Sequence, residues 1–190
     1  MVGEKLVKFS FMNMSWTGAN DKLHQLVIGF KGLGRVEIEF DFGPGKVVKT
    51  FDLNQSRQVG RDWMSVYCKN EQGYNTKAFK WHIFSGGGYP SVSGEEARAA
   101  YGQHEATLYV IMPNTGGCAV LTDAKPTSCS LSDYYVFPEN LAWTMAFTHE
   151  EGWLGPYFAK HPQYSSLQQE IFQQIEKQHQ KELARKKGWW

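Results

Sequence analysis

The sequence predicts an α+β fold, in which an antiparallel meander sheet carries one short inserted helix and a long C-terminal helix. Residues 36–42 alternate apolar with charged side chains, which is the period-two pattern of a half-buried strand. Two later segments carry the spacing of a capping box at a helix start, one from Ser93 and one from Ser166. Strands and helices that occupy separate stretches of the chain indicate the α+β class.

Length and composition predict one globular domain over residues 1–190. The chain is 42% hydrophobic, 15% aromatic and 21% charged, which is typical of a packed core and not of a disordered chain. A single core can serve a chain of 190 residues. Within it we expect a hairpin-rich N-terminal part (1–78), a central part (79–160) and a C-terminal helix (162–188).

Charge and apolar runs argue against two classes of partner. The net charge is +1 and the pI about 7.7, so no overall field attracts nucleic acid or an anionic membrane. The longest apolar run, residues 108–112, is far too short to cross a bilayer. Residues 1–5 do not resemble the start of a secretory signal. We therefore expect a cytoplasmic protein without a membrane partner.

The N-terminal part is predicted to consist of strands joined by a tight turn. Residues 6–12 form one candidate strand and residues 36–42 another. Two glycines and a proline at 43–45 supply the backbone angles of a turn, and residues 46–53 return in an extended pattern. The last three segments together predict a β-hairpin.

The central part begins with a predicted strand at residues 79–85. Three glycines at 86–88 form a flexible connection, which lacks the GxGxxG or Lys-Ser/Thr pattern of a phosphate-binding loop. The helix that starts at Ser93 is expected to end near Tyr101.

A second hairpin and two more strands are predicted next. Residues 106–112 and 118–121 are apolar runs separated by the turn-forming residues 113–117. Two further apolar segments, near 134–137 and 143–148, continue the meander.

The C-terminal helix has a narrow apolar stripe. Leu167, Ile171 and Ile175 repeat every four residues, as one helix face requires. Basic residues from Lys181 onward complement the helix dipole, so they need no nucleic-acid partner. Gly188 is expected to end the helix.

Several short motifs resemble, in order, a bacterial family known only as domain of unknown function 4275. The motifs are WHIFS (81–85), GEEA (94–97), DYYV (133–136), WTMAFTHE (143–150) and GPYF (155–158). The resemblance spans about residues 79–160. It implies a shared fold and brings no established activity.

No cofactor and no metal site is expected. Cys68, Cys118 and Cys129 are widely spaced and odd in number, which predicts reduced thiols and neither a disulfide framework nor a CxxC zinc site. The sequence also contains no HExxH, HxH or Cys/His cluster.

An enzyme is one interpretation, and it would use two histidines. His82 and His149 lie in predicted strands and could line one end of the sheet, with Glu150 beside His149. Neighbouring strand residues point to opposite faces, so His149 and Glu150 can share a ligand only if the chain turns between them. The alternative is that both histidines are structural, hydrogen-bonded to backbone or to a carboxylate.

Protein binding is the interpretation we favour. Residues 133–158 interleave carboxylates with aromatic rings and contain no Lys or Arg. Exposed Trp and Tyr are enriched at interface hot spots, and carboxylates steer a basic partner. The expected binding residues are Tyr135, Glu139, Trp143, Glu150, Glu151, Trp153 and Tyr157.

The leading functional hypothesis is an immunity-type inhibitor that neutralises a toxin by direct binding. It needs no catalytic constellation, and it rests on an analogy of type, not on a motif. The alternatives are a hydrolase-type enzyme using His82 and His149, and a homo-oligomeric structural protein.

Overall fold

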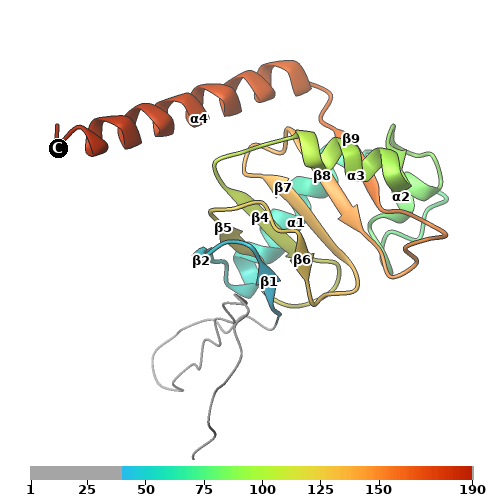
Figure 1. The fold of residues 1–190 in the computed structure, drawn as a ribbon. Coiled ribbons are helices and arrows are strands. Elements are labelled where there is room, and N and C mark those ends of the chain that lie inside the picture. Colours follow the sequence, from blue (N-terminus) through green and yellow to red (C-terminus); the bar gives the residue numbers. More distant parts are fainter. Residues whose placement is uncertain (1–39, 190) are drawn as a thin grey trace, which may run out of the picture.

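The computed structural model describes residues 40–189, and its centre is a seven-stranded antiparallel sheet (Figure 1). The elements in chain order are β1 (Phe42–Gly43), β2 (Val47–Thr50), α1 (Leu53–Tyr67), α2 (His82–Ser85), β3 (Val92–Ser93), α3 (Gly94–Gln103), β4 (Tyr109–Pro113), β5 (Val120–Thr122), β6 (Ser128–Cys129), β7 (Tyr134–Pro138), β8 (Trp143–Phe147), β9 (Tyr157–Lys160) and α4 (Tyr164–Lys186). The strand order is β2-β5-β4-β7-β8-β9-β3, and β1 pairs with β6 apart from it.

The predicted α+β class is confirmed, together with most of the elements after residue 90. The β4–β5 hairpin and the strands β7 and β8 lie where the apolar runs predict them. The short helix α3 and the long helix α4 are also present. The capping details differ, because Ser93 is the N-cap of α3 without a side-chain hydrogen bond and α4 begins earlier, after Gln163.

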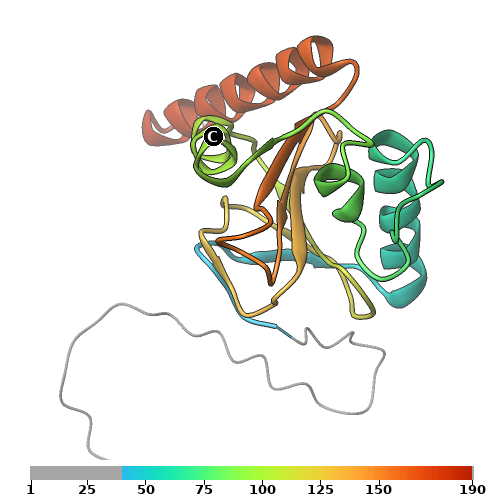
Figure 2. The same cartoon turned by 90° about the vertical axis from the view of Figure 1, so that its right-hand side faces the viewer.

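Helices cover both faces of the sheet, so the fold has three layers. Figure 2 shows α1 and α2 on one side and α3 and α4 on the other. Trp63, Trp81 and Phe84 from the first side pack on alternate sheet residues such as Tyr135. Tyr101 and Ile171 from the second side pack on the intervening residues. As a consequence, β4 and β7 are buried at every position.

The hairpin predicted over residues 36–53 is wrong. The two short strands of this region do not pair with each other: β1 pairs with β6, and β2 pairs with β5 at the edge of the large sheet. Each strand finds its partner in a distant part of the chain, which a local turn pattern cannot reveal. The predicted strand at 6–12 and most of the one at 36–42 lie outside the described residues.

Helix α1 was not predicted, and it lies in the N-terminal part (1–78) that was expected to be hairpin-rich. Asp52 caps it through a complete capping box: the Asp52 side chain accepts a hydrogen bond from Gln55 N (2.8 Å), and the Gln55 side chain accepts one from Asp52 N (3.1 Å). Its buried face consists of Ser56, Gly60, Trp63 and Tyr67.

The strand predicted at residues 79–85 is also wrong, because α2 forms a single helical turn there. Trp81, Ile83 and Phe84 are all buried, and three such side chains in a run of four cannot lie on one face of a strand. The turn inserts them into the core between α1 and the sheet.

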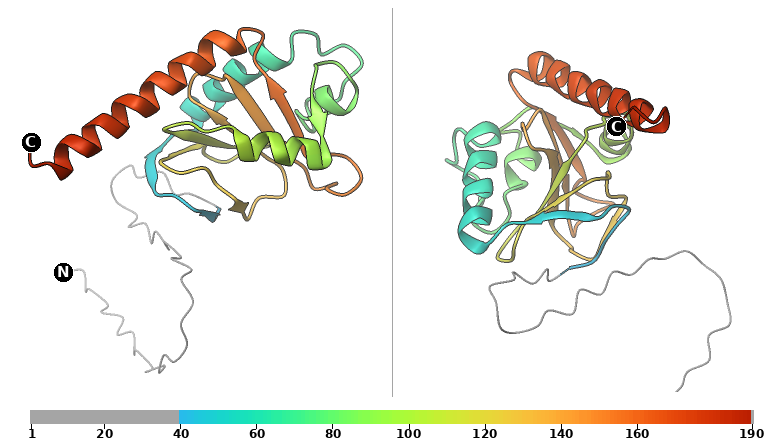
Figure 3. Two further views of the ribbon diagram at one scale, coloured as in Figure 1. Left: turned by 45° about the horizontal axis from the view of Figure 1, so that its top comes forward. Right: turned by 90° about the vertical axis from the view of Figure 1, so that its left-hand side faces the viewer.

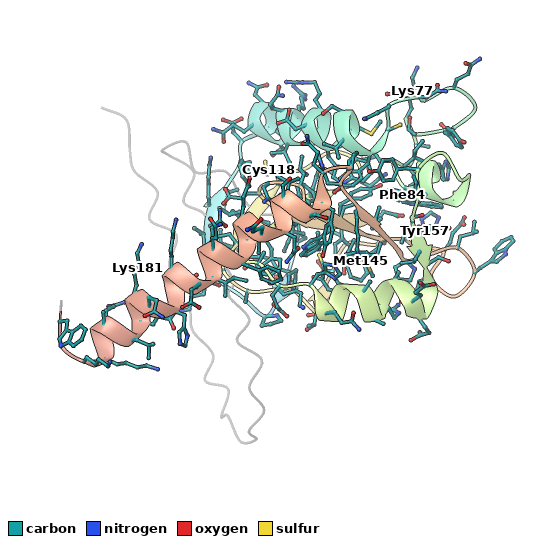
Figure 4. The ribbon with its side chains drawn as sticks, turned by 90° about the horizontal axis from the view of Figure 1, so that it is seen from above. Lys77, Phe84, Cys118, Met145, Tyr157 and Lys181 are labelled. Carbon is teal, nitrogen blue, oxygen red and sulfur yellow. The ribbon has the colours of Figure 1, made fainter. Side chains whose placement is uncertain are left out.

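Helix α4 packs on the body only through its first half. Ile171 is fully buried, and Leu167 and Ile175 flank it as the stripe predicts. The second half extends beyond the body in Figures 1 and 3, and Lys181 lies on this projecting part in Figure 4. Gly188 follows with φ of 71°, as expected for a helix end. No helix in residues 40–189 has the length and apolar character needed to cross a bilayer.

Candidate functional site

One corner of the molecule brings together residues from segments far apart in the chain. β7 and β8 pair with Tyr134 opposite Phe147, so Asp133, which directly precedes β7, lies beside the residues that follow β8. His149 is one of these residues. Trp81 reaches the same place from the turn of α2 and stacks on Tyr157 of β9 at 6.2 Å between ring centres.

Asp133 is the centre of this corner. Its Oδ1 atom accepts hydrogen bonds from Trp81 Nε1 (2.9 Å) and from the His149 backbone N–H (3.2 Å). The His149 ring donates from Nδ1 to the same oxygen at 2.9 Å. The Asp133 side chain is only 12% exposed. We refer to Trp81, Asp133 and His149 as the Asp133 cluster.

The Asp133 contact determines how His149 can act. A carboxylate on Nδ1 keeps the proton on that nitrogen and leaves Nε2 as the outward, basic atom. The nearest carboxylate to Nε2 belongs to Glu150, with Oε1 at 3.8 Å. The ring lies against Phe79, with 4.8 Å between ring centres. His149 is therefore oriented by contacts on three sides.

The second histidine of the enzyme hypothesis lies nearby but does not join this network. His82 is in α2, and its ring stands perpendicular to Trp81 with 4.4 Å between ring centres. It also contacts Phe79. Within residues 40–189 no hydrogen bond links His82 to His149 or to Asp133. The two histidines therefore lie against the same aromatic pair, Phe79 and Trp81, without a hydrogen bond between them.

The hydrogen bond from His149 to Asp133 raises the pKa of His149 above its ordinary value. Because the folded-state pKa is the higher one, the stabilisation by this contact is fully present below about pH 6.5 and is lost as the pH rises through the folded pKa. We predict that Asp133→Asn lowers the pKa of His149, measured by NMR titration of its ring protons. Circular dichroism of the variant controls for folding, and an unchanged pKa would show that Asp133 does not hold the ring.

The loop after β8 presents a large exposed aromatic side chain. Trp153 is 86% exposed, although it belongs to a well-anchored turn. The Glu150 carbonyl accepts hydrogen bonds from Trp153 N (2.9 Å) and Leu154 N (2.8 Å), and Thr148 Oγ1 donates to the Leu154 carbonyl (2.5 Å). We refer to residues 149–154 as the β8–β9 loop.

Glycines allow the tight path of this loop. Gly152 and Gly155 have φ of 100° and 97°, in the region that favours glycine. A Cβ atom on Gly155 would lie 2.9 Å from Thr148 Oγ1. The GPYF motif thus closes the loop against the end of β8.

Two carboxylates precede the tryptophan in the loop, and one of them ties the loop to the body. Glu151 forms an ion pair with Arg98 of α3, and Glu150 lies close to His149. Both glutamates remain partly exposed, with side chains about one third and one half accessible. The loop therefore presents an indole ring with two acidic neighbours.

The expected binding residues divide into two groups. Tyr135, Trp143 and Tyr157 are buried, so their predicted place on a binding surface is wrong. Strand alternation sends residues to two faces, but helices cover both faces of this sheet. Glu139 is exposed at the opposite end of β7, away from the loop. The residues that remain accessible together are Glu150, Glu151 and Trp153.

Burial disfavours the thiolate form at two of the three cysteines. Cys68 and Cys118 are buried, Cys129 is partly so, and none is in a disulfide. Burial raises the pKa of the Cys68 and Cys129 thiols, which lowers the thiolate fraction. In the described part of the chain, no three His, Cys, Asp or Glu side chains gather as a metal site would require.

Sequence reasoning did not identify the central residue of the site. In the sequence, Asp133 is one of several acids in the segment 133–158, and Trp81 belongs to the WHIFS motif. The signal was available in principle, because a hairpin that pairs residues 134–136 with 145–147 necessarily brings positions 133 and 148–149 together.

Comparison with known proteins identifies a family for the larger part of the chain. A family described as a domain of unknown function (DUF4275) matches residues 51–158. This range covers α1 and the Asp133 cluster and starts earlier than the expected 79–160. No curated protein and no solved structure matches the chain.

Proposed function

The chain belongs to the DUF4275 family, and we propose that it functions by binding another protein through the β8–β9 loop, with Trp153 as the anchor. The observation that carries the proposal is the exposure of this indole ring on a loop that hydrogen bonds hold in place. Isolated exposed apolar residues are common, but tryptophan is the residue most enriched at interface hot spots.

The anchoring of the loop supports this role energetically. A flexible loop loses conformational freedom when a partner binds, and this loss reduces affinity. The turn at Glu150 and the bond between Thr148 and Leu154 already restrict the β8–β9 loop in the free protein. Docking of Trp153 into a pocket of the partner then requires little further ordering.

The local charge favours a basic partner. Glu150 and Glu151 precede Trp153 in the same loop, and residues 133–158 contain no Lys or Arg. Arg98 pairs with Glu151 and His149 lies near Glu150, so each carboxylate is partly compensated within the protein. Their remaining charge contributes to steering. A partner with a cationic rim around an apolar pocket would complement this surface.

For the class of partner, we propose a toxin that the protein neutralises as an immunity-type inhibitor. Inhibition by direct binding requires a complementary surface and no catalytic group. An acidic and aromatic loop can cover a cationic active site, which would block the substrate of such a toxin.

We predict that Trp153→Ala weakens partner binding by about 2–4 kcal/mol, or roughly 30-fold to 1000-fold, because it removes the hot-spot ring. The partner is first isolated from the native host by pull-down with the wild-type protein, and its affinity is then measured by biolayer interferometry. Phe172→Ala is the matched control, since Phe172 is an exposed aromatic residue of α4 that lies outside the loop. Equal affinities for Trp153→Ala and the wild type would contradict the proposal.

Binding kinetics test the role of the loop's charge, and co-expression with the partner tests inhibition. Glu150→Lys should slow association and reduce its dependence on salt, since steering acts on the association rate. The isolated partner should lose its toxicity when co-expressed with the wild-type protein and keep it with Trp153→Ala. A non-toxic partner would leave the binding proposal in place and contradict the toxin proposal.

A hydrolytic or acid/base enzyme is the second candidate, and the Asp133–His149 contact favours it. A carboxylate that orients a histidine and raises its pKa is a common arrangement for general acid/base catalysis. His149→Gln separates the two candidates. A folded His149→Gln protein that retains partner binding and biological effect supports the binder, whereas loss of the effect without loss of binding supports the enzyme.

A further inference from the structure

A cavity of about 750 Å³ lies between α1 and the turn that joins β4 to β5. Its volume is in the range of small-molecule binding sites. Met64, Met112 and Pro113 form apolar walls, and Gly116 and Gly117 form part of the rim. Neither the Asp133 cluster nor the β8–β9 loop lines this cavity.

Three cationic side chains line the cavity. Arg57 and Arg61 are four residues apart on α1, and Lys80 comes from the segment before α2. Glu71 is the one carboxylate among the lining residues. Within residues 40–189, none of these three cations forms an ion pair with a carboxylate. Arg57 donates instead to Asn54 (3.4 Å) and Arg61 to Gln58 (3.0 Å), which are neutral residues on the same helix.

Lys80 is held at the cavity by a buried polar residue. Its Nζ atom donates to the Asn114 carbonyl, and its backbone N–H donates to Asn114 Oδ1 at 3.1 Å. Asn114 is itself buried and receives a hydrogen bond from Tyr135 (2.8 Å). Burial lowers the pKa of Lys80, because its ammonium group is partly desolvated without an opposite charge to compensate.

Lys80 is the partly buried member of this group, whereas Arg57 and Arg61 are exposed on α1. Partly buried cations are normally paired, because desolvation of an unpaired charge lowers stability. A bound oxyanion would supply the missing partner for Lys80. Two arginines on one helix face can each present a planar pair of N–H donors to its oxygens.

We propose that this cavity binds a small organic anion that carries a phosphate or two carboxylates. Arg57, Arg61 and Lys80 would contact its oxygens, and the methionine walls would contact its apolar part. No aromatic ring lines the cavity, so no stacking surface for a nucleobase is present there. The size favours a metabolite and not a macromolecule.

The anion site does not depend on the proposed protein partner. The two regions are nevertheless neighbours, since Lys80 precedes Trp81 and Asn114 N donates to the Asp133 carbonyl at 3.1 Å. A variant that loses anion binding while Trp153-dependent partner binding persists would separate the two functions.

The test is isothermal titration calorimetry of the full chain in phosphate-free buffer. Inorganic pyrophosphate represents the phosphate class and citrate the carboxylate class, with sodium chloride at matched ionic strength as the blank. We expect saturable binding of at least one probe. Arg57→Gln, Arg61→Gln and Lys80→Met should each weaken it by about tenfold or more, as loss of a charge-assisted hydrogen bond requires.

Lys77→Gln is the matched control, since Lys77 is exposed and does not line the cavity (Figure 4). It should bind the probe with wild-type affinity. The probe that binds with the higher affinity, pyrophosphate or citrate, indicates whether the site prefers phosphates or carboxylates. The proposal would be overturned if neither probe binds at concentrations up to about 10 mM, since a site with three cations should reach roughly millimolar affinity or better. Equal weakening by Lys77→Gln and by the arginine variants would also overturn it, because only a non-specific charge effect would remain.

Discussion

Trp63→Ala is expected to lower the free energy of unfolding by about 3–5 kcal/mol, which is the usual range for removal of a large buried aromatic ring. Trp63 is fully buried and contacts the rings of Tyr67, Phe84 and Tyr135. Its Nε1 atom also donates to Thr144 Oγ1 at 2.9 Å, across the interface between α1 and the sheet. The substitution therefore leaves a cavity and removes the hydrogen-bond donor of a buried hydroxyl.

Chemical denaturation monitored by circular dichroism measures this change. Trp153→Ala is the matched control, because the same substitution at an exposed tryptophan should change stability by less than about 0.5 kcal/mol. If both variants are equally stable, Trp63 does not hold α1 on the sheet. The control also shows whether a binding defect of Trp153→Ala can be attributed to the lost ring and not to unfolding.

Asn114→Ala is expected to destabilise the protein by about 2–4 kcal/mol, since a lost partner for a buried polar group typically costs 1–3 kcal/mol. Asn114 is buried, and its side chain serves three partners. Its Oδ1 atom accepts from Tyr135 (2.8 Å) and from Lys80 N (3.1 Å), and its Nδ2 atom donates to the Ala78 carbonyl (2.8 Å). Alanine leaves all three without this partner.

Thermal and chemical denaturation measure the loss, with Asn75→Ala as the control. Asn75 is exposed, so its replacement should have little effect. Asn114→Ala should also weaken anion binding, because Asn114 positions Lys80. Wild-type stability of Asn114→Ala would mean that the segment at residues 78–81 is held by its aromatic side chains alone.

The sequence predicted the second half of the fold well because the signals there are local. The β4–β5 hairpin is two apolar runs around a polar and glycine-containing turn. Helix α4 follows directly from the spacing of Leu167, Ile171 and Ile175. Each of these patterns lies within one stretch of chain and needs no distant partner.

Helix α1 escaped prediction because its buried face is not apolar in sequence. The buried positions follow helical spacing, but Ser56 and Gly60 occupy two of the four. The buried Ser56 hydroxyl is satisfied there, because it accepts a hydrogen bond from Ala119 N (2.9 Å). A search for helical spacing of hydrophobic residues does not detect buried positions that are occupied by serine or glycine. The capping box of Asp52 and Gln55 is a local signal for the start of this helix. It directly follows residues 46–51, whose pattern predicts an extended strand.

The candidate site was predicted in part for a similar reason. The motif around His149 and the acidic character of the loop were visible in the sequence. The burial of Tyr135 and Trp143 depends on helices that cover both faces of the sheet, which no strand pattern encodes. The contact between Asp133 and His149 depends on the register of β7 and β8, and the cationic cavity depends on the position of the unpredicted α1.

The two edges of the sheet restrict how this protein can meet other chains. A long, regular edge strand offers unpaired N–H and C=O groups to which another strand can add. In residues 40–189, one edge is β3, which has only two residues before α3 begins. The other edge is β2, a four-residue strand whose pairing is irregular between Val47 and Lys49.

Short and irregular edges of this kind protect a β-rich protein from self-assembly into open-ended sheets. The aggregation-prone apolar segments of β4, β7 and β8 all lie in the interior of the strand order, where both neighbours are already paired. At these two ends of the large sheet, strand addition by another chain is therefore disfavoured.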